Sequence, residues 1–266
     1  MYEAVAALGK EEVEMGERLS QVLLTDQNWI NRCVAQVEPA EFGVEWAAGP
    51  GALTAGVLER WEQLLALEID FSYCRRLREK FVDPPAVIRA DILKYPLPKI
   101  CSPYPLVGNL PYHLTGPLLV KILRNADKIN SFQGLIQEEV AERVCAEAGE
   151  SNYSGISVLF QLSGRVEKCF TVPAGAFSPV PGVDSAWLKF MVEERIENFE
   201  GLRKFARRCF QQPRKTLLNN LAAGADKEKW RRLLKEVGLD ERCRPHQVKP
   251  KKFLEVFSRW EQGKSS

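Results

Sequence analysis

Short apolar runs alternate with amphipathic stretches along most of the chain. Apolar runs of about four to eight residues bounded by turn residues are typical of buried strands, and apolar positions three and four apart are typical of helices. Helices are predicted over most of residues 1–40 (with Asp26 as the cap of 27–37), 53–61, 71–81 and 138–146, and strands over 43–46, 64–68, 86–90, 106–108, 131–137, 157–162, 166–172 and 186–192. This rhythm predicts an α/β fold with a doubly wound, Rossmann-like parallel sheet.

The pattern changes near residue 193. Beyond it the periodicity is helical, with helices predicted over 199–211, 214–223, 227–237 and 251–261. We therefore expect two domains, residues 1–193 with the sheet and a small all-helical domain over 194–266.

Charge is divided unevenly between these parts. The whole chain carries +2, but residues 201–266 contain 18 Lys/Arg against 7 Asp/Glu, a net of +11, so residues 1–200 carry −9. A basic module on an acidic body favours a polyanionic partner such as RNA, with a solvated helical surface as the alternative. The candidate RNA-binding residues are Arg207, Arg208, Arg214 and Lys215.

Composition narrows the class of protein further. Among the 266 residues, 45% are hydrophobic, which is typical of a globular domain, and no apolar run approaches the ~18 residues of a membrane helix. The first 18 residues contain five glutamates, unlike an acid-poor targeting peptide, so we expect a cytoplasmic location. Seven scattered cysteines and two distant histidines show no metal-ligand spacing, so we expect no metal and no disulfide set. Because no apolar run is long enough, we also expect no membrane partner.

The segment Asn109-Leu110-Pro111-Tyr112 follows an apolar run that reads as the end of a strand. Ligands of open α/β sheets bind at the carboxyl ends of strands. There, the Asn109 carboxamide and a nearby carbonyl could accept hydrogen bonds from an exocyclic amine, and Tyr112 could stack on the ring that carries it. An ordinary strand followed by a turn with a packed tyrosine fits these four residues equally well.

A second candidate site lies at the preceding strand ends. Glycines in the turn Ala47 to Gly51 allow a close approach of backbone and ligand. Glu68 follows Glu45 by 23 residues, at the spacing where a carboxylate accepts hydrogen bonds from ribose hydroxyls, and Asp91 at the next strand end could accept from an adenine amine. Together with Asn109, these residues predict one crevice for a nucleoside cofactor.

The glycine turn resembles the first motif of S-adenosylmethionine methyltransferases, and the whole chain resembles the ribosomal RNA small-subunit adenine N6,N6-dimethyltransferases, the KsgA family. Four further segments match that family's motifs in the same order: 137–143, 153–158, 177–185 and 210–220. The resemblance implies a methyltransferase fold, S-adenosylmethionine as cofactor, and transfer of two methyl groups to adenine N6 in small-subunit ribosomal RNA or a pre-30S-like particle. We expect the protein to act as a monomer.

The resemblance also implies roles for individual residues. The residues that would contact the target amine and base are Asn109, Leu110, Tyr112 and Phe177, with the two aromatic rings on either side of a flipped adenine. The residues that would hold the cofactor are Gln21, Leu24, Gly49, Gly51, Glu68, Asp91 and Asn109.

Three departures from the family pattern leave other functions open. Val22 stands where the family has a cofactor-contacting asparagine, Ala47 replaces the first glycine of the turn, and Pro213 replaces one RNA-facing arginine. The same fold with a decayed cofactor site would be a non-enzymatic ribosome assembly factor. A small-molecule N-methyltransferase and a large-subunit adenine methylase are further alternatives, the first disfavoured by the basic C-terminal part.

Overall fold

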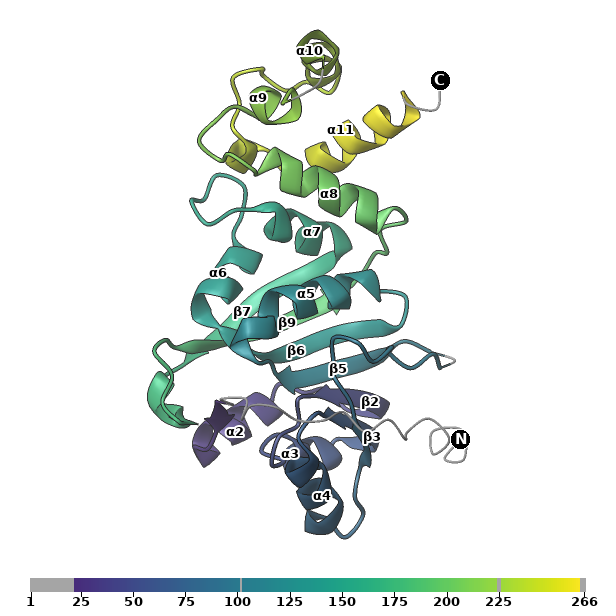
Figure 1. Cartoon of the computed structure of the whole chain (residues 1–266), viewed down its shortest axis with the longest axis vertical. Coiled ribbons are helices and arrows are strands. Elements are labelled where there is room, and N and C mark those ends of the chain that lie inside the picture. Colours follow the sequence, from purple (N-terminus) through teal and green to yellow (C-terminus); the bar gives the residue numbers. More distant parts are fainter. Residues whose placement is uncertain (1–21, 101, 224–225, 264–266) are drawn as a thin grey trace.

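A seven-stranded sheet forms the centre of the protein in its computed structural model, which describes residues 22–100, 102–223 and 226–263 (Figure 1). The strand order is β4-β3-β2-β5-β6-β9-β7, and all strands run parallel except β9, which is antiparallel to β6 and β7. The strands are β2 (Ala40–Trp46), β3 (Trp61–Glu68), β4 (Ala86–Arg89), β5 (Tyr104–Asn109), β6 (Ile129–Gln137), β7 (Gly164–Val172) and β9 (Ser185–Val192). The predicted doubly wound sheet is confirmed.

Helices cover both faces of this sheet because its strands are apolar on both sides. Along β3, Leu65 and Leu67 join the hydrophobic cluster that contains the helix after β5, whereas Ala66 packs with Leu77 of the helix after β3. The helices of this part are α2 (Gln27–Val34), α3 (Thr54–Leu58), α4 (Phe71–Lys80), α5 (Thr115–Arg124), α6 (Glu138–Cys145) and α7 (Gly155–Ser163). Asp26 caps α2 as predicted, accepting from the Asn28 and Trp29 amides.

The sheet reverses its strand order at β2, and this places three functional strand ends side by side. Trp46, the last residue of β2, pairs with Leu67 of β3 on one side and with Gly108 of β5 on the other. A side chain at Gly108 would lie 2.5 Å from the Trp46 carbonyl oxygen, so only glycine fits there. Open sheets of this kind bind ligands at such a switch point.

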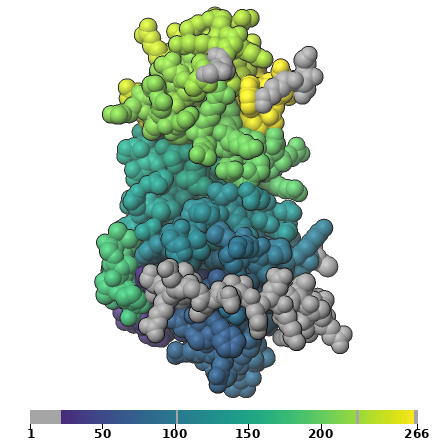
Figure 2. Space-filling model, viewed as in Figure 1, coloured from purple at the N-terminus to yellow at the C-terminus, as the bar shows by residue number. Residues whose placement is uncertain are grey.

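The C-terminal helices pack against the sheet domain without a gap in the core. They are α8 (Phe199–Cys209), α9 (Leu217–Leu221), α10 (Lys227–Glu236) and α11 (Pro250–Gln262). Figures 1 and 2 show them at one end of the elongated molecule, beyond α7. Phe205 of α8 and Phe253 of α11 belong to the same hydrophobic cluster as Phe160 of α7 and Phe190 of β9. The helical part therefore shares its core with the sheet, although the chain does become helical after β9 as predicted.

Two elements differ from the sequence-based expectations. Residues 157–162, predicted as a strand, lie inside the helix α7, whose start is fixed by the Ser157 hydroxyl accepting from the Ser154 amide at 3.0 Å. This apolar run is buried between the sheet and the C-terminal helices, so it lacks the polar face that reveals helical periodicity. The helix predicted over 53–61 ends at Leu58, and Trp61 already begins β3.

Two elements of the structure were not predicted, and part of one predicted helix lies outside the described residues. The helix α5 was not predicted. A two-stranded pair, β1 (Leu23–Leu24) with β8 (Phe177–Ser178), was not predicted either. Of the helix expected over residues 1–40, residues 1–21 lie outside the described part of the chain.

Candidate functional site

A cavity of about 590 Å³ opens at the carboxyl ends of the central strands. Six residues predicted from the sequence line it together: Gly49, Glu68, Asp91, Asn109, Leu110 and Tyr112. Val22, Ala47 and the prolines Pro179 and Pro181 also line it. These predicted residues therefore meet at one cavity.

Glu68, the last residue of β3, is a buried acidic residue that lines the cavity. Its carboxylate accepts three backbone hydrogen bonds at 2.8 Å, from the amides of Gly49, Ile69 and Asp70. Burial raises the pKa of Glu68, and these amide donors oppose that shift. The donors fix the carboxylate in one orientation: Oε1 accepts two of the three bonds, and Oε2, which accepts only from Gly49, keeps a lone pair that can accept from a bound hydroxyl group.

The turn after β2 determines the shape of the cavity beside Glu68. Gly49 has φ +55°, lines the cavity and donates its amide to Glu68. Gly51 has φ +86° but does not line the cavity; a side chain there would meet Leu77 at 3.0 Å. Ala47 has φ +54°, a left-handed conformation that an alanine adopts only at a cost. Gly51 therefore shapes the turn, and Ala47 strains it.

Glu45 lies behind this turn as a buried carboxylic acid. It is 1% exposed, and its Oε2 accepts from the Thr54 hydroxyl at 2.7 Å. Burial raises its pKa to about 8. At neutral pH Glu45 is thus largely protonated, and it supports the turn rather than facing the cavity.

Asp91 stands at the outer side of the cavity, after β4. Its Oδ1 accepts from the Leu93 amide at 2.9 Å, and its Oδ2 lies 3.8 Å from the Lys94 ammonium. The carboxylate is partly open to solvent, so it retains the capacity to accept from an amine in the cavity.

Asn109 and Tyr112 are held in place by contacts from distant segments. The Asn109 carboxamide nitrogen donates to the Val22 carbonyl at 3.1 Å, which leaves its oxygen as an acceptor. The Tyr112 hydroxyl lies 2.7 Å from the Ser185 hydroxyl on β9, and burial raises the pKa of Tyr112. Sequence reasoning missed Ser185 as the partner, because the two residues are 73 positions apart.

Three predicted site residues, Leu24, Gly51 and Phe177, lie outside the cavity, and a fourth lies outside the described residues. Leu24 and Phe177 pair across β1 and β8, are 3% and 2% exposed, and pack in a cluster with Trp187. The ring of Phe177 is therefore committed to the core, so the expected pair of rings around a base is not assembled in this arrangement. Gln21 precedes the described residues.

The four predicted RNA-binding residues divide into two kinds. Arg207, Arg214 and Lys215 are exposed. Arg208 is half-buried: its guanidinium donates to the carbonyls of Leu221 and Ala223 and lies 5.7 Å from the Trp230 ring centre. Arg208 thus braces the C-terminal helices, which the spacing of charges in the sequence could not reveal.

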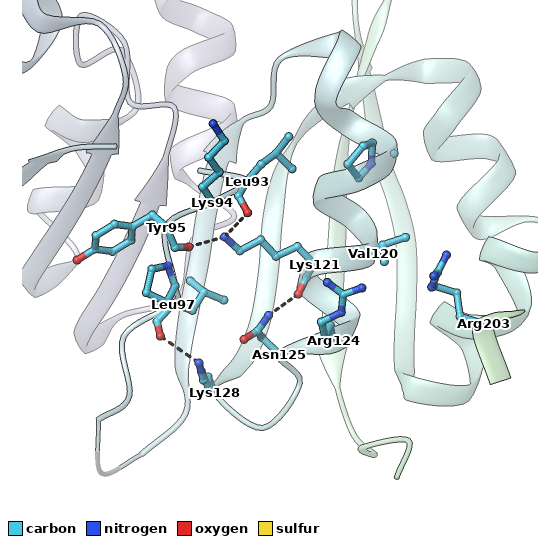
Figure 3. A pocket seen from close by; sticks show the side chains of 13 residues that line it. Leu93, Lys94, Tyr95, Leu97, Val120, Lys121, Arg124, Asn125, Lys128 and Arg203 are labelled. Atoms are coloured by element: carbon cyan, nitrogen blue, oxygen red, sulfur yellow. Dashed lines mark hydrogen bonds between the residues drawn. The ribbon is translucent and has the colours of Figure 1, made fainter. Parts of the chain in front are cut away.

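A second cavity, of about 540 Å³, lies between α5 and the segment that follows Asp91 (Figure 3). We call it the basic groove, because five cations line it: Lys94, Lys121, Arg124, Lys128 and Arg203. Glu200 pairs with both Arg124 and Arg203 and so links α5 to α8. Leu93 lines both cavities, which makes the groove a neighbour of the first one.

Two further features bear on the class of site. No group of three or more metal-ligating side chains occurs among the described residues. None of the helices in the described part of the chain is long and apolar enough to cross a membrane.

Comparison with known proteins gives a consistent result. A family model described as ribosomal RNA adenine dimethylase matches residues 14–262. A ribosomal RNA small subunit methyltransferase A from Campylobacter hominis is 32% identical over 91% of this chain and 94% of its own length. The protein of the same name from Acidobacterium capsulatum is 40% identical over 68% of this chain and 67% of its own.

Solved structures agree with the fold. A dimethyladenosine transferase from Plasmodium falciparum has a TM-score of 0.79 at 22% identity, covering 90% of this chain and 98% of its own. The 23S rRNA methyltransferase ErmE has a TM-score of 0.69 at 25% identity, covering 90% and 99%.

Proposed function

The chain belongs to the ribosomal RNA adenine dimethylase family, and from this premise we propose that it transfers two methyl groups from S-adenosylmethionine to the N6 amine of adenine in small-subunit ribosomal RNA. The observation that carries the proposal is the meeting of Glu68, Asp91, Asn109 and Tyr112 around one cavity. We place the reaction in the cytoplasm, on the RNA or a pre-30S-like particle, and expect a monomer.

The residues of the inner cavity suit a nucleoside cofactor. Glu68 has its carboxylate fixed by three amides, and the lone pair left on Oε2 can accept from a ribose hydroxyl. Asp91 can accept from the adenine amine of the same molecule. When bound, S-adenosylmethionine supplies an activated methyl group on a sulfonium. The chain's task is to orient the cofactor and to exclude water from the crevice.

Asn109 and Leu110 would orient the target amine. The Asn109 carboxamide oxygen and the Leu110 carbonyl can accept its two hydrogens, which turns the nitrogen lone pair away from the ring and toward the cofactor side of the cavity. Because the lone pair of an adenine amine is otherwise delocalised, such positioning supplies most of the rate. The amine proton becomes acidic as the new bond forms and can pass to water, so no strong base is needed.

Tyr112 would hold the target base. Its hydroxyl is tied to Ser185, so the ring presents a fixed face at the mouth of the cavity. An adenine must leave its helical stack to bring N6 into the crevice, and an aromatic face compensates for the lost stacking. Pro179 and Pro181 line the same cavity and provide apolar contact near this ring.

Positive surface on two sides supports an RNA substrate. Residues 201–266 carry a net charge of +11, and the exposed residues Arg207, Arg214 and Lys215 lie in that part. The basic groove adds the exposed Lys94 beside the cavity, whereas its other four cations contact carbonyls or Glu200 within the protein. Exposed cations bind phosphates and make affinity fall with salt.

Methyl transfer to unmethylated small ribosomal subunits tests the proposal. With labelled S-adenosylmethionine we expect two methyl groups per modified adenine, and labelling about 10- to 100-fold slower with the Tyr112→Ala variant. Binding of the cofactor without any transfer, or no heat in calorimetry at millimolar cofactor together with retained RNA binding, would instead support the assembly-factor function. The assembled set of cavity residues and the family relationship favour the enzyme.

A further inference from the structure

One cation of the basic groove differs from the others in how it is bound. Lys121 reaches from α5 to the segment that follows Asp91, and its ammonium donates to the carbonyls of Ile92 at 2.5 Å, Leu93 at 3.2 Å and Tyr95 at 2.5 Å. Figure 3 shows its side chain directed at this segment, away from Arg124 and Arg203.

These three contacts use the full donor capacity of the side chain. An ammonium has three N–H donors, and each has a carbonyl partner here. Burial lowers the pKa of Lys121, whose ammonium also lies 5.5 Å from the centre of the buried Trp46 ring. Lys121 is therefore a tie between two parts of the protein, with no donor left for a phosphate.

The segment that Lys121 holds follows β4, the edge strand of the sheet, and no helix or strand covers residues 90–100 and 102–103. Farther along this segment, Leu97 is buried in the core, and the carbonyls of Leu97 and Pro98 accept from the Lys128 ammonium and the Tyr104 hydroxyl. Within the segment, the amides of Lys94 and Tyr95 donate to the Asp91 carbonyl. Next to Asp91, the position of the segment relative to α5 is thus fixed by the Lys121 ammonium together with the burial of Ile92.

The tie leads directly to the Asp91 carboxylate. Lys121 holds the Leu93 carbonyl, and the Leu93 amide donates to Asp91 Oδ1 at 2.9 Å. Ile92 and Leu93 also line the cavity in which the cofactor is proposed to bind. A shift of the segment would therefore move both an apolar wall and the carboxylate orientation.

We propose that Lys121 is a positioning residue for the cofactor: it fixes the Asp91 segment from behind and thereby sets the adenine end of the cofactor cavity. This inference rests on the proposed function, because it takes Asp91 as the acceptor for the cofactor's adenine amine. Lys121 itself touches neither cofactor nor RNA.

The test is the affinity for S-adenosylmethionine in Lys121→Met, which keeps the length and apolar stem but removes all three donors. We expect the dissociation constant, measured by calorimetry, to rise about tenfold or more, since small displacements of a binding group cost factors of this order. The kcat at saturating cofactor should stay within about threefold, because the methyl-transfer residues are on other strands. A folded Lys121→Met protein with wild-type cofactor affinity would overturn the proposal.

Two companion variants separate positioning from general damage. Lys128→Met is the matched control: Lys128 lines the same groove but donates to one carbonyl, that of Leu97 at 3.1 Å, farther from the cavity. Its cofactor affinity should stay within about twofold of wild type. In an Asp91→Ala background, Lys121→Met should weaken binding much less than it does alone, because coupled residues are non-additive. Additive effects would contradict an action through Asp91.

Failure to fold would not leave the proposal untested. If Lys121→Met gives no folded protein, Lys121→Gln, which keeps two N–H donors on a shorter side chain, is measured in the same way. A dissociation constant about threefold or more above wild type is then expected from the weakened contacts, and an unchanged value overturns the inference. Wild-type protein that binds no cofactor at all would refute the proposed function instead.

Discussion

Replacing Ala47 by glycine is expected to stabilise the protein even though it removes a methyl group. The residue has φ +54°, where a side chain costs about 1–2 kcal/mol and glycine costs nothing. The opposing terms are the greater freedom of glycine in the unfolded chain, about 0.4–1 kcal/mol, and the loss of a half-buried methyl group, at most about 0.8 kcal/mol. The balance is a small net gain of about 0.5 kcal/mol.

The neighbouring residue provides the control. Ala48 is 6% exposed and is not among the positive-φ residues of the described chain, so Ala48→Gly relieves no strain. It should lose about 1.5 kcal/mol through the entropy and burial terms alone. Urea unfolding at fixed pH measures both free energies. We therefore expect the two substitutions to differ by about 2 kcal/mol, with opposite signs.

Ala47→Gly should also change the affinity for the cofactor. Ala47 lines the cavity, and a glycine there gives the backbone a closer approach to a ligand. Combined with Val22→Asn, which restores a polar side chain to the cavity wall, it should tighten binding of S-adenosylmethionine in calorimetry. The strain argument fails if Ala47→Gly and Ala48→Gly destabilise the protein equally.

Three other perturbations test separate parts of the structure. Glu45→Gln should flatten the pH dependence of stability. In the wild type the folded pKa of Glu45, about 8, exceeds the unfolded value of 4.5, so the free energy of unfolding falls by about 1.4 kcal/mol for each unit that the pH rises between about pH 5 and 7. Urea titrations at several pH values measure this slope. Tyr112→Ala should lower methylation about 10- to 100-fold, the worth of one base stack, at unchanged cofactor affinity; normal turnover would exclude stacking on this ring. Arg214→Ala should reduce the salt dependence of RNA binding by about one unit of slope in filter binding, whereas Arg208→Ala should lower the melting temperature, since that guanidinium is used internally. Equal salt slopes for wild type and Arg214→Ala would remove Arg214 from the RNA surface.

The sequence predicted the parts of the site that depend on local order. Glu68, Asp91 and Asn109 were found because parallel strands end at one edge, so position along the chain implies position in space. Phe177 and Ser185 could not be placed, because their surroundings depend on how β8 and β9 fold back onto distant segments. Periodicity failed at 157–162 for a related reason: most of this segment is apolar and packed between the sheet and the C-terminal helices, so no polar face indicates a helix.

The roles of the cations show a further limit of sequence reading. The sequence shows Lys121, Arg208 and Arg214 only as basic residues and does not distinguish their roles. Only packing shows that the first ties down a segment, the second braces a helix end and the third is exposed. Charge counts thus indicate the kind of partner, but not which charges are available to it.

Because the sheet and the C-terminal helices share one hydrophobic core, the distance between these two parts of the molecule is fixed. Phe205 and Phe253 are 3% and 0% exposed within a cluster that reaches into the sheet, so the helices cannot swing away without uncovering them. If the C-terminal helices bind the RNA backbone while the cavity receives the base, the distance between these two contacts is constant. Selection of an adenine then depends on its distance from the bound backbone in the folded RNA, with little need to recognise the nucleotides in between.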